Sequence, residues 1–271
     1  MITTSTWRWP TPNGLPPLPL VGGVLALLCT LWLTAPIVEM DFVHLIDSIG
    51  KMVAFAGHIF VTPDWDYIPQ LLARMRETIE MTLLATAIAV VLSLPLSILA
   101  ARNATPHIVV YRLTRDLLSL MRALPELVWA LVFVSAVGLG PLPGVMALAF
   151  VTVGFMSKFF AESIEVVDHK AVEGVRAHGA GWLHVRLFAM LPQALPDFVG
   201  TVMYILDHNL RAAAILGLVG AGGIGYDIVM TMRLFTYDRM LLIALSIYLV
   251  VTALDRASDR FRSRIIQGKG L

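Results

Sequence analysis

The chain has 271 residues, of which 58% are hydrophobic and only 14% are charged. Soluble domains carry about 25% charged residues, so this composition excludes an ordinary soluble domain and predicts an all-α polytopic membrane protein with about six spanning helices. The formal net charge of +1 gives no reason to expect nucleic acid as a partner. The single cysteine, Cys29, excludes an internal disulfide and a zinc-type cysteine pattern.

The beginning of the chain changes from proline-rich to apolar. Residues 1–19 contain Pro10, Pro12 and a cluster near Pro17, which disfavour a helix and predict a cytoplasmic lead-in. The apolar stretch Leu20–Val38 is longer than a signal-peptide core, so it is expected to remain as the first spanning helix. The rest of segment 20–77 is expected to be external, with an amphipathic helix lying on the membrane.

Further apolar stretches predict the remaining spans and a core over residues 78–258. The expected spans are Thr78–Ala101, Leu117–Leu139, Val145–Glu162, Ala194–Leu218 and Met240–Leu254. Pro95 lies inside the first of these, where a membrane helix tolerates proline. A basic tail is expected over residues 259–271.

The distribution of basic residues predicts the orientation. Basic residues are concentrated after the second and fourth spans and at the C-terminal end: Arg102, Arg112, Arg115, Lys170, Arg176, Arg186, Arg256, Arg260, Arg262 and Arg264. Because positively charged loops stay in the cytoplasm, we expect a multi-pass protein of the cell (inner) membrane with both termini cytoplasmic.

The segment 168–192 between the fourth and fifth spans contains the most informative motif. An acid, Glu173, is followed by Gly179 and then by Leu191 and Pro192. This spacing predicts a short helix, a sharp turn at Gly179, a second short helix and the start of the fifth span at Pro192. The segment is too apolar for a free loop, which is typical of a docking element for a soluble partner.

The same segment resembles the coupling loop of ABC-importer permeases, with the pattern E-A-A-x₃-G-x₉-I-x-L-P. The chain departs from the pattern at Gly174, Val175 and Ala189, which keep small or apolar character. The resemblance implies that two separate ATPase subunits, which bind ATP and Mg²⁺, dock on this loop, and that the chain itself binds no cofactor. The coupling residues that it implies are Glu173, Arg176, His178, Gly179, Leu191 and Pro192.

Three further stretches resemble the permeases of phosphonate and phosphite-type importers. They are Met81–Ala101, the run RALPE from Arg122 to Glu126, and RAAAILGLVGAGGIG from Arg211 to Gly225. The resemblance implies the type I ABC importer permease fold and a homodimer with the pathway between subunits. It also implies a separate substrate-binding protein and a phosphonate or related phosphorus oxyanion (phosphite, phosphate ester) as substrate.

Ionisable residues inside spans are costly and usually functional, which singles out two clusters. Asp207 and Arg211 share a helix face, and together with His208 they are candidates for the substrate pathway. The alternative is a structural Asp–Arg pair that holds helices together. Arg122 and Glu126 have the same spacing around Pro125, and they are read as part of a kinked pathway helix or as an interfacial pair.

A glycine-rich run follows the fifth span: Gly217, Gly220, Gly222, Gly223 and Gly225. Its GxGxxG spacing does not indicate a dinucleotide site, because a membrane helix rather than a strand precedes it. Close helix packing or a re-entrant segment near a gate is expected, and a plain external turn is the alternative.

Enzyme chemistry is not indicated, since no Walker A pattern, metal-ligand spacing or nucleophile motif occurs. No catalytic residue and no metal site are expected. Three alternatives remain open: a permease of the same fold for methionine or another small organic solute, an intramembrane enzyme that uses Asp207 and His208, and a membrane scaffold without transport.

Overall fold

The computed structural model describes residues 18–36, 42–59 and 64–266, and within these ranges the chain is helical without strands. It divides into two units, residues 1–58 and 59–271. The first unit carries α1 (Leu18–Thr34) and α2 (Phe42–Ile59). The predicted lead-in over residues 1–19 lies outside the described residues, except for its last two. The helix α1 has 17 residues, which is at the short limit for crossing a bilayer.

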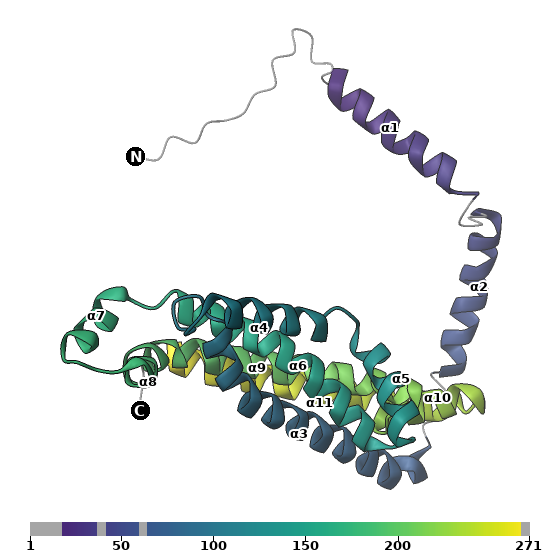
Figure 1. Ribbon diagram of the computed structural model, residues 1–271. Helices are drawn as coiled ribbons and strands as arrows, with labels where there is room; N and C mark the ends of the chain where they lie inside the picture. Colours follow the sequence, from purple (N-terminus) through teal and green to yellow (C-terminus); the bar gives the residue numbers. More distant parts are fainter. Residues whose placement is uncertain (1–17, 37–41, 60–63, 267–271) are drawn as a thin grey trace. The chain divides into compact units, whose positions relative to one another are not determined.

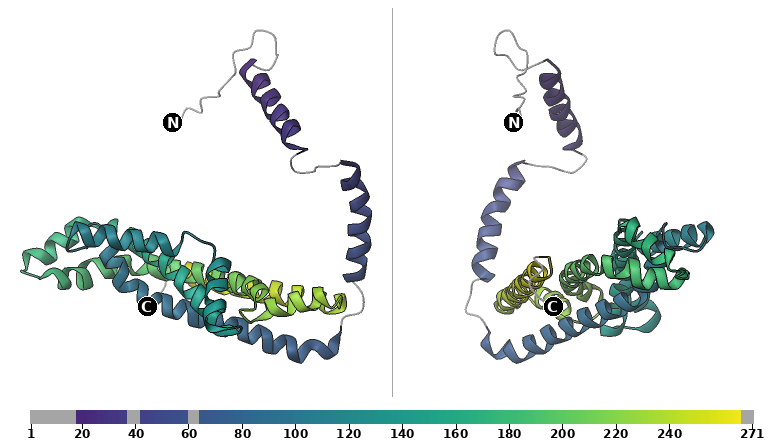
Figure 2. Two further views of the ribbon diagram at one scale, coloured as in Figure 1. Left: turned by 45° about the vertical axis from the view of Figure 1, so that its right-hand side comes forward. Right: turned by 90° about the vertical axis from the view of Figure 1, so that its left-hand side faces the viewer.

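The second unit is a helical bundle (Figures 1 and 2). Its helices are α3 (Ile68–Ala100), α4 (Ile108–Met121), α5 (Glu126–Val137), α6 (Pro141–Glu165), α7 (His169–Ala177), α8 (Trp182–Val185), α9 (Leu191–Leu216), α10 (Ile224–Arg233) and α11 (Tyr237–Ile266). The helix α6 packs against α3, α4, α5 and α9 and is the most buried of the apolar spans. The helices α7 and α8 lie at one end of the bundle, and α10 lies at the other (Figure 1).

Four helices of the described chain are long and apolar enough to cross a membrane, and the bent pair α4–α5 adds up to a fifth. One span starts earlier than its apolar stretch suggests, because α3 begins at Ile68 rather than at Thr78. Leu71 and Met75 are buried against Ile224 of α10. This packing extends the helix beyond the purely apolar stretch, so the compact unit begins well before residue 78.

The span predicted over Leu117–Leu139 is broken near Pro125 into two separate helices. The helices α4 and α5 are bent by 84° at the break between them. Leu124 precedes Pro125, and a residue before proline is disfavoured in helical conformation. Pro125 itself is extended, with φ −58° and ψ 152°. The spacing of Arg122 and Glu126 therefore does not place them on one helix face.

A buried amide joins the three central helices α3, α6 and α9. Asn209 is 1% exposed. Its Nδ2 donates to Thr86 Oγ1 of α3 at 3.0 Å, and its Oδ1 accepts from Thr152 Oγ1 of α6 at 3.0 Å. Interhelical hydrogen bonds hold membrane helices together where no hydrophobic driving force acts between them.

We expect Asn209→Ala to lower the free energy of unfolding by about 1–2 kcal/mol, because two interhelical hydrogen bonds are lost. Denaturant titration of the detergent-solubilised protein measures this change. Ser135→Ala is the matched control, since the exposed Ser135 hydroxyl bonds only to Leu131 O of its own helix. Equal effects of the two substitutions would contradict the prediction.

Candidate functional site

The predicted docking element is a helical hairpin formed by α7 and α8. Asp168 caps α7 by accepting from the backbone N–H of Lys170 at 2.9 Å. Gly179 has φ +80° and forms the turn, and its N–H donates to Arg176 O at 2.9 Å. The short helix and the turn at Gly179 are therefore confirmed. The side chains of Glu173, Arg176 and His178 are exposed, and the His178 ring is held by a 2.8 Å contact between its Nδ1 and Gly174 O.

The second helix of the hairpin and the fifth span are one continuous helix rather than two elements. The span runs over Trp182–Val219 and contains a π-helical turn at Arg186–Met190. Pro192 lacks an N–H, and its ring would crowd the carbonyl of Phe188 in a regular α-helix. The wider π turn, in which the Leu191 N–H bonds to Arg186 O, accommodates the proline without ending the helix. Leu191 and Pro192 therefore lie inside the helix, just after the π turn.

Arg186 ties the hairpin to the rest of the bundle, a role that the sequence analysis did not assign. Its side chain is buried. Its Nε donates to Ala104 O at 2.9 Å in the loop between α3 and α4, and its Nη1 donates to Trp182 O at 2.9 Å. The guanidinium also lies 4.5 Å from the centre of the Trp182 ring. The sequence could have indicated this role, because Arg186 is a lone arginine inside the apolar run WLHVRLFAM and such a charge needs partners within the protein.

A partly open cavity of about 200 Å³, with a mainly apolar wall that holds a few polar groups, lies between α5, α6 and α9. His208 Nε2 and Glu126 Oε1 are 3.2 Å apart in its wall. The other lining residues are Thr152, Phe155, Phe159, Tyr204, Ile205 and Asn209. The cavity thus brings together one residue from each of the two ionisable clusters, which lie far apart in the sequence.

The other residues predicted for the substrate pathway, Asp207, Arg211 and Arg122, do not line this cavity. The predicted Asp207–Arg211 ion pair is confirmed. Arg211 also approaches Asp255 of α11, with Nη1 and Oδ1 3.8 Å apart. The structure therefore places Asp207 and Arg211 on the α11 side of α9. Arg122 pairs with neither Asp207 nor Glu126. Its Nε donates to Leu118 O at 3.1 Å, and its guanidinium lies 5.4 Å from the Phe155 ring centre.

The glycine-rich run packs against α3 and is not a free external turn. Gly223, at φ +70°, donates its N–H to Glu77 Oε1 at 3.2 Å. The next N–H, that of Ile224, donates to Thr78 Oγ1 at 2.8 Å. Two side chains of α3 thus satisfy the first backbone donors of α10. The other left-handed glycines of the loop are Gly220 and Gly222.

Gly217 and Gly225 let α9 and α10 approach closely. A Cβ added at Gly217 would overlap the backbone of Gly225 and Tyr226, and one at Gly225 would lie 2.9 Å from the Gly217 Cα. Small residues at such contacts are typical of membrane helix packing. The expectation of close packing is therefore confirmed at these two positions.

The same end of the bundle holds a charged network that the sequence analysis missed. Asp227 of α10 accepts a hydrogen bond from the Tyr67 hydroxyl and lies 3.4 Å from Arg74 Nε. Arg74 also pairs with Glu77 at 2.9 Å. The network binds the start of α3 to α10, and only the three-dimensional structure brings these distant positions together. In the described part of the chain, no cluster of three His, Cys, Asp or Glu side chains could hold a metal ion.

Solved structures of ABC transporters share the fold of this helical bundle. The inward-facing MetNI methionine ABC transporter matches with a TM-score of 0.64 at 21% identity, over 74% of this chain and 99% of that chain. An amino acid ABC transporter crystallised with histidines matches with a TM-score of 0.63 at 19% identity, over 75% of this chain and 100% of that chain. At these identities the likeness shows the fold alone.

Sequence comparisons define the family. Residues 93–267 match the family described as "Binding-protein-dependent transport system inner membrane component". The phosphite transport system permease protein PtxC of Stutzerimonas stutzeri is 39% identical over 243 residues, 90% of this chain and 86% of that protein. The phosphate-import permease protein PhnE of Mycolicibacterium smegmatis is 41% identical over 76% of this chain but only 39% of its own length.

The chain therefore belongs to the family of binding-protein-dependent transport system inner membrane components. It is a membrane-spanning permease subunit of an ATP-driven importer and not an enzyme. Its ATPase is a separate partner chain, and a substrate-binding protein completes the transporter.

We expect Gly217→Ala to destabilise the fold by about 1–3 kcal/mol, because the added methyl group must push α10 away from α9. Thermal unfolding in detergent measures the change. Gly200→Ala is the matched control in the same helix, because no atom lies within 4 Å of a Cβ added there. That variant should be neutral or slightly more stable. A stable Gly217→Ala protein would refute the close contact.

Proposed function

We propose that this chain forms the translocation pathway for a phosphonate or a related phosphorus oxyanion, such as phosphite or a phosphate ester. The observation that supports this substrate class most strongly is the 39% identity to a phosphite permease over 90% of the chain. Two of the three segments that suggested the substrate class, RALPE and Arg211–Gly225, contribute Glu126 to the cavity and Arg211 to the adjacent face of α9.

The polar groups in the cavity wall suit transient contact with an anion. His208 and Tyr204 supply hydrogen-bonding groups in a wall that also contains Phe155 and Phe159. Glu126 holds the His208 ring and balances its charge when the ring is protonated. Conduction requires binding that is favourable enough for entry but weak enough for release, and a pre-paired histidine meets both needs.

In this proposal, the α7–α8 hairpin docks on the ATPase through Glu173, Arg176, His178 and Gly179. Arg186 carries the movement of the hairpin to the α3–α4 loop through its bond to Ala104 O. Leu191 and Pro192 carry it into α9, because the helix continues through the π turn. ATP and Mg²⁺ bind to the partner ATPase, and this chain needs no cofactor of its own.

The proposed assembly contains two copies of the chain, two ATPase subunits and one substrate-binding protein. The hairpin faces the cytoplasm, where the ATPases are. Both termini are then cytoplasmic, which agrees with the basic residues beside the hairpin and near the C-terminal end. The pathway would run between the two copies.

The substrate class is tested with the complete transporter reconstituted with its ATPase and its binding protein. ATP hydrolysis should rise when phosphite or a phosphonate is added, and methionine should have no effect. Stimulation by methionine but not by any phosphorus oxyanion would overturn the substrate assignment and favour the alternative solute class.

Gly179→Asp should reduce substrate uptake by about tenfold or more while the subunit stays folded. Asp tolerates the left-handed conformation, and no atom of this chain lies within 4 Å of a Cβ added there. The loss would then come from the partner, where an unpaired carboxylate is buried. Uptake assays and co-purification of the ATPase measure it. Gly179→Asn is the neutral control, and equal effects of Asp and Asn would exclude the charge as the cause.

A further inference from the structure

Lys158 is a cation within a membrane-spanning helix, and no role has been assigned to it. It lies in α6, whose side chains are mostly buried and apolar. Lys158 is half-buried, and its Nζ lies 3.6 Å from Glu162 Oε1, one helical turn further along. A charge at such a position is expensive and usually serves a function.

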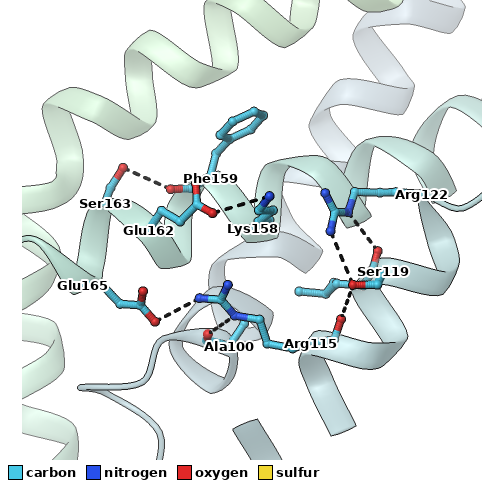
Figure 3. A network of polar contacts seen from close by, with 10 residues as sticks. Ala100, Arg115, Ser119, Arg122, Lys158, Phe159, Glu162, Ser163 and Glu165 are labelled. Carbon is cyan, nitrogen blue, oxygen red and sulfur yellow. Dashed lines mark hydrogen bonds and ion pairs between the residues drawn. The ribbon is translucent and has the colours of Figure 1, made fainter. Parts of the chain in front are cut away.

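Arg122 lies against the same face of α6. A Cβ added at Gly154 would lie 2.7 Å from Arg122 Cγ, so the stem of this arginine crosses α6 at Gly154. Lys158 follows Gly154 by four positions, which places the two on one helix face. Arg122 and Lys158 thus occupy successive turns of that face, and Figure 3 shows both side chains in the α4–α6 network.

The two cations are held more loosely than their neighbour Arg115. Arg115 is fully engaged, because it donates to Ala100 O and pairs with Glu165, both at 2.9 Å (Figure 3). In the part of the chain that the structure describes, no carboxylate pairs with Arg122, whose partners are Leu118 O and, at 3.5 Å, the Ser119 hydroxyl. The 3.6 Å contact between Lys158 and Glu162 leaves other ammonium donors available.

The pair lies beside the cavity, level with Phe155 and Phe159, which are the part of the cavity wall nearer the α7–α8 hairpin. Phe155 and Phe159 form part of the cavity wall. The Arg122 guanidinium lies over the Phe155 ring, and Lys158 lies between the two phenylalanines in the sequence. Since α6 runs from the α5 end to α7, Lys158 and Glu162 lie beyond Thr152 in the direction of the hairpin.

We propose that Lys158 and Arg122 form an exit-side site for a phosphorus oxyanion that leaves the cavity toward the hairpin. The proposal rests on the proposed function, since it takes the transported anion as the ligand. Arginine offers a planar fork that matches phosphate-like oxygens, and lysine offers a point charge. Glu162 competes for Lys158 and keeps the site weak enough to release its ligand.

The test uses the complete transporter in liposomes loaded with phosphite. Internal phosphite should bind the exit-side site and inhibit uptake of labelled phosphite from outside. In Lys158→Gln and in Arg122→Gln, the internal concentration that halves uptake should rise about three- to tenfold, because one partly screened charge interaction is lost. Lys158→Arg should stay close to wild type, since it keeps the charge.

Arg76→Gln is the matched control, because Arg76 also pairs with a glutamate one turn away, Glu80, but on α3 and 80% exposed. Wild-type uptake that internal phosphite does not inhibit, or inhibition unchanged in both glutamine variants, would overturn the exit-side site alone. Absence of any wild-type uptake of phosphorus oxyanions would remove the proposed function itself.

Phosphate groups of lipids share this chemistry, so the liposomes are prepared in two forms. One contains only phosphatidylcholine, and the other also contains anionic phosphatidylglycerol. A variant defect that appears in both supports a site for the transported anion. A defect confined to the anionic liposomes would assign the cations to a lipid headgroup and overturn the proposal.

Discussion

The orientation of α9 depends on one buried amide. Asn209 bonds to Thr86 of α3 and to Thr152 of α6, and its near-complete burial leaves no water to replace either partner. Because successive residues of a helix are about 100° apart, fixing Asn209 also fixes its neighbours. His208 then points to Glu126 of α5, while Asp207 and Arg211 face α11. The division of α9 into a cavity side and an α11 side follows from this arrangement.

The same helix links the two ends of the bundle. At the hairpin end, the π turn lets α9 continue past Pro192, and Arg186 fastens this end to the loop after α3. At the other end, the Gly217–Gly225 contact fastens α9 to α10, whose first N–H groups bond to Glu77 and Thr78 of α3. Close-packed contacts of this kind switch between discrete arrangements and do not deform gradually. In the proposed cycle, a shift of the hairpin therefore moves α9 and α3 together.

Local features of the fold could be predicted from the sequence, and contacts between distant segments could not. The apolar spans, the turn at Gly179 and the Asp207–Arg211 pair depend on residues within a few positions of one another. The prediction that Arg122 and Glu126 pair was wrong, because four-residue spacing brings two side chains together only in an unbroken helix. Pro125 already indicated the break between α4 and α5. The Glu126–His208 contact and the capping of α10 by Glu77 and Thr78 arise from packing, which no local pattern encodes.

In the proposed function, the arrangement of charges explains how the pathway can attract an anion without trapping it. Lys158 has Glu162 one turn away, and His208 has Glu126 on the neighbouring helix. Each acid reduces the net charge that a passing anion meets, while the cation keeps donors free to bind it. A bare arginine in a low-dielectric pathway would hold a dianion tightly, since charge interactions there are much stronger than in water. In this proposal, Arg122 binds the anion most tightly, because its partners are a carbonyl, a hydroxyl and the Phe155 ring and include no carboxylate among the described residues.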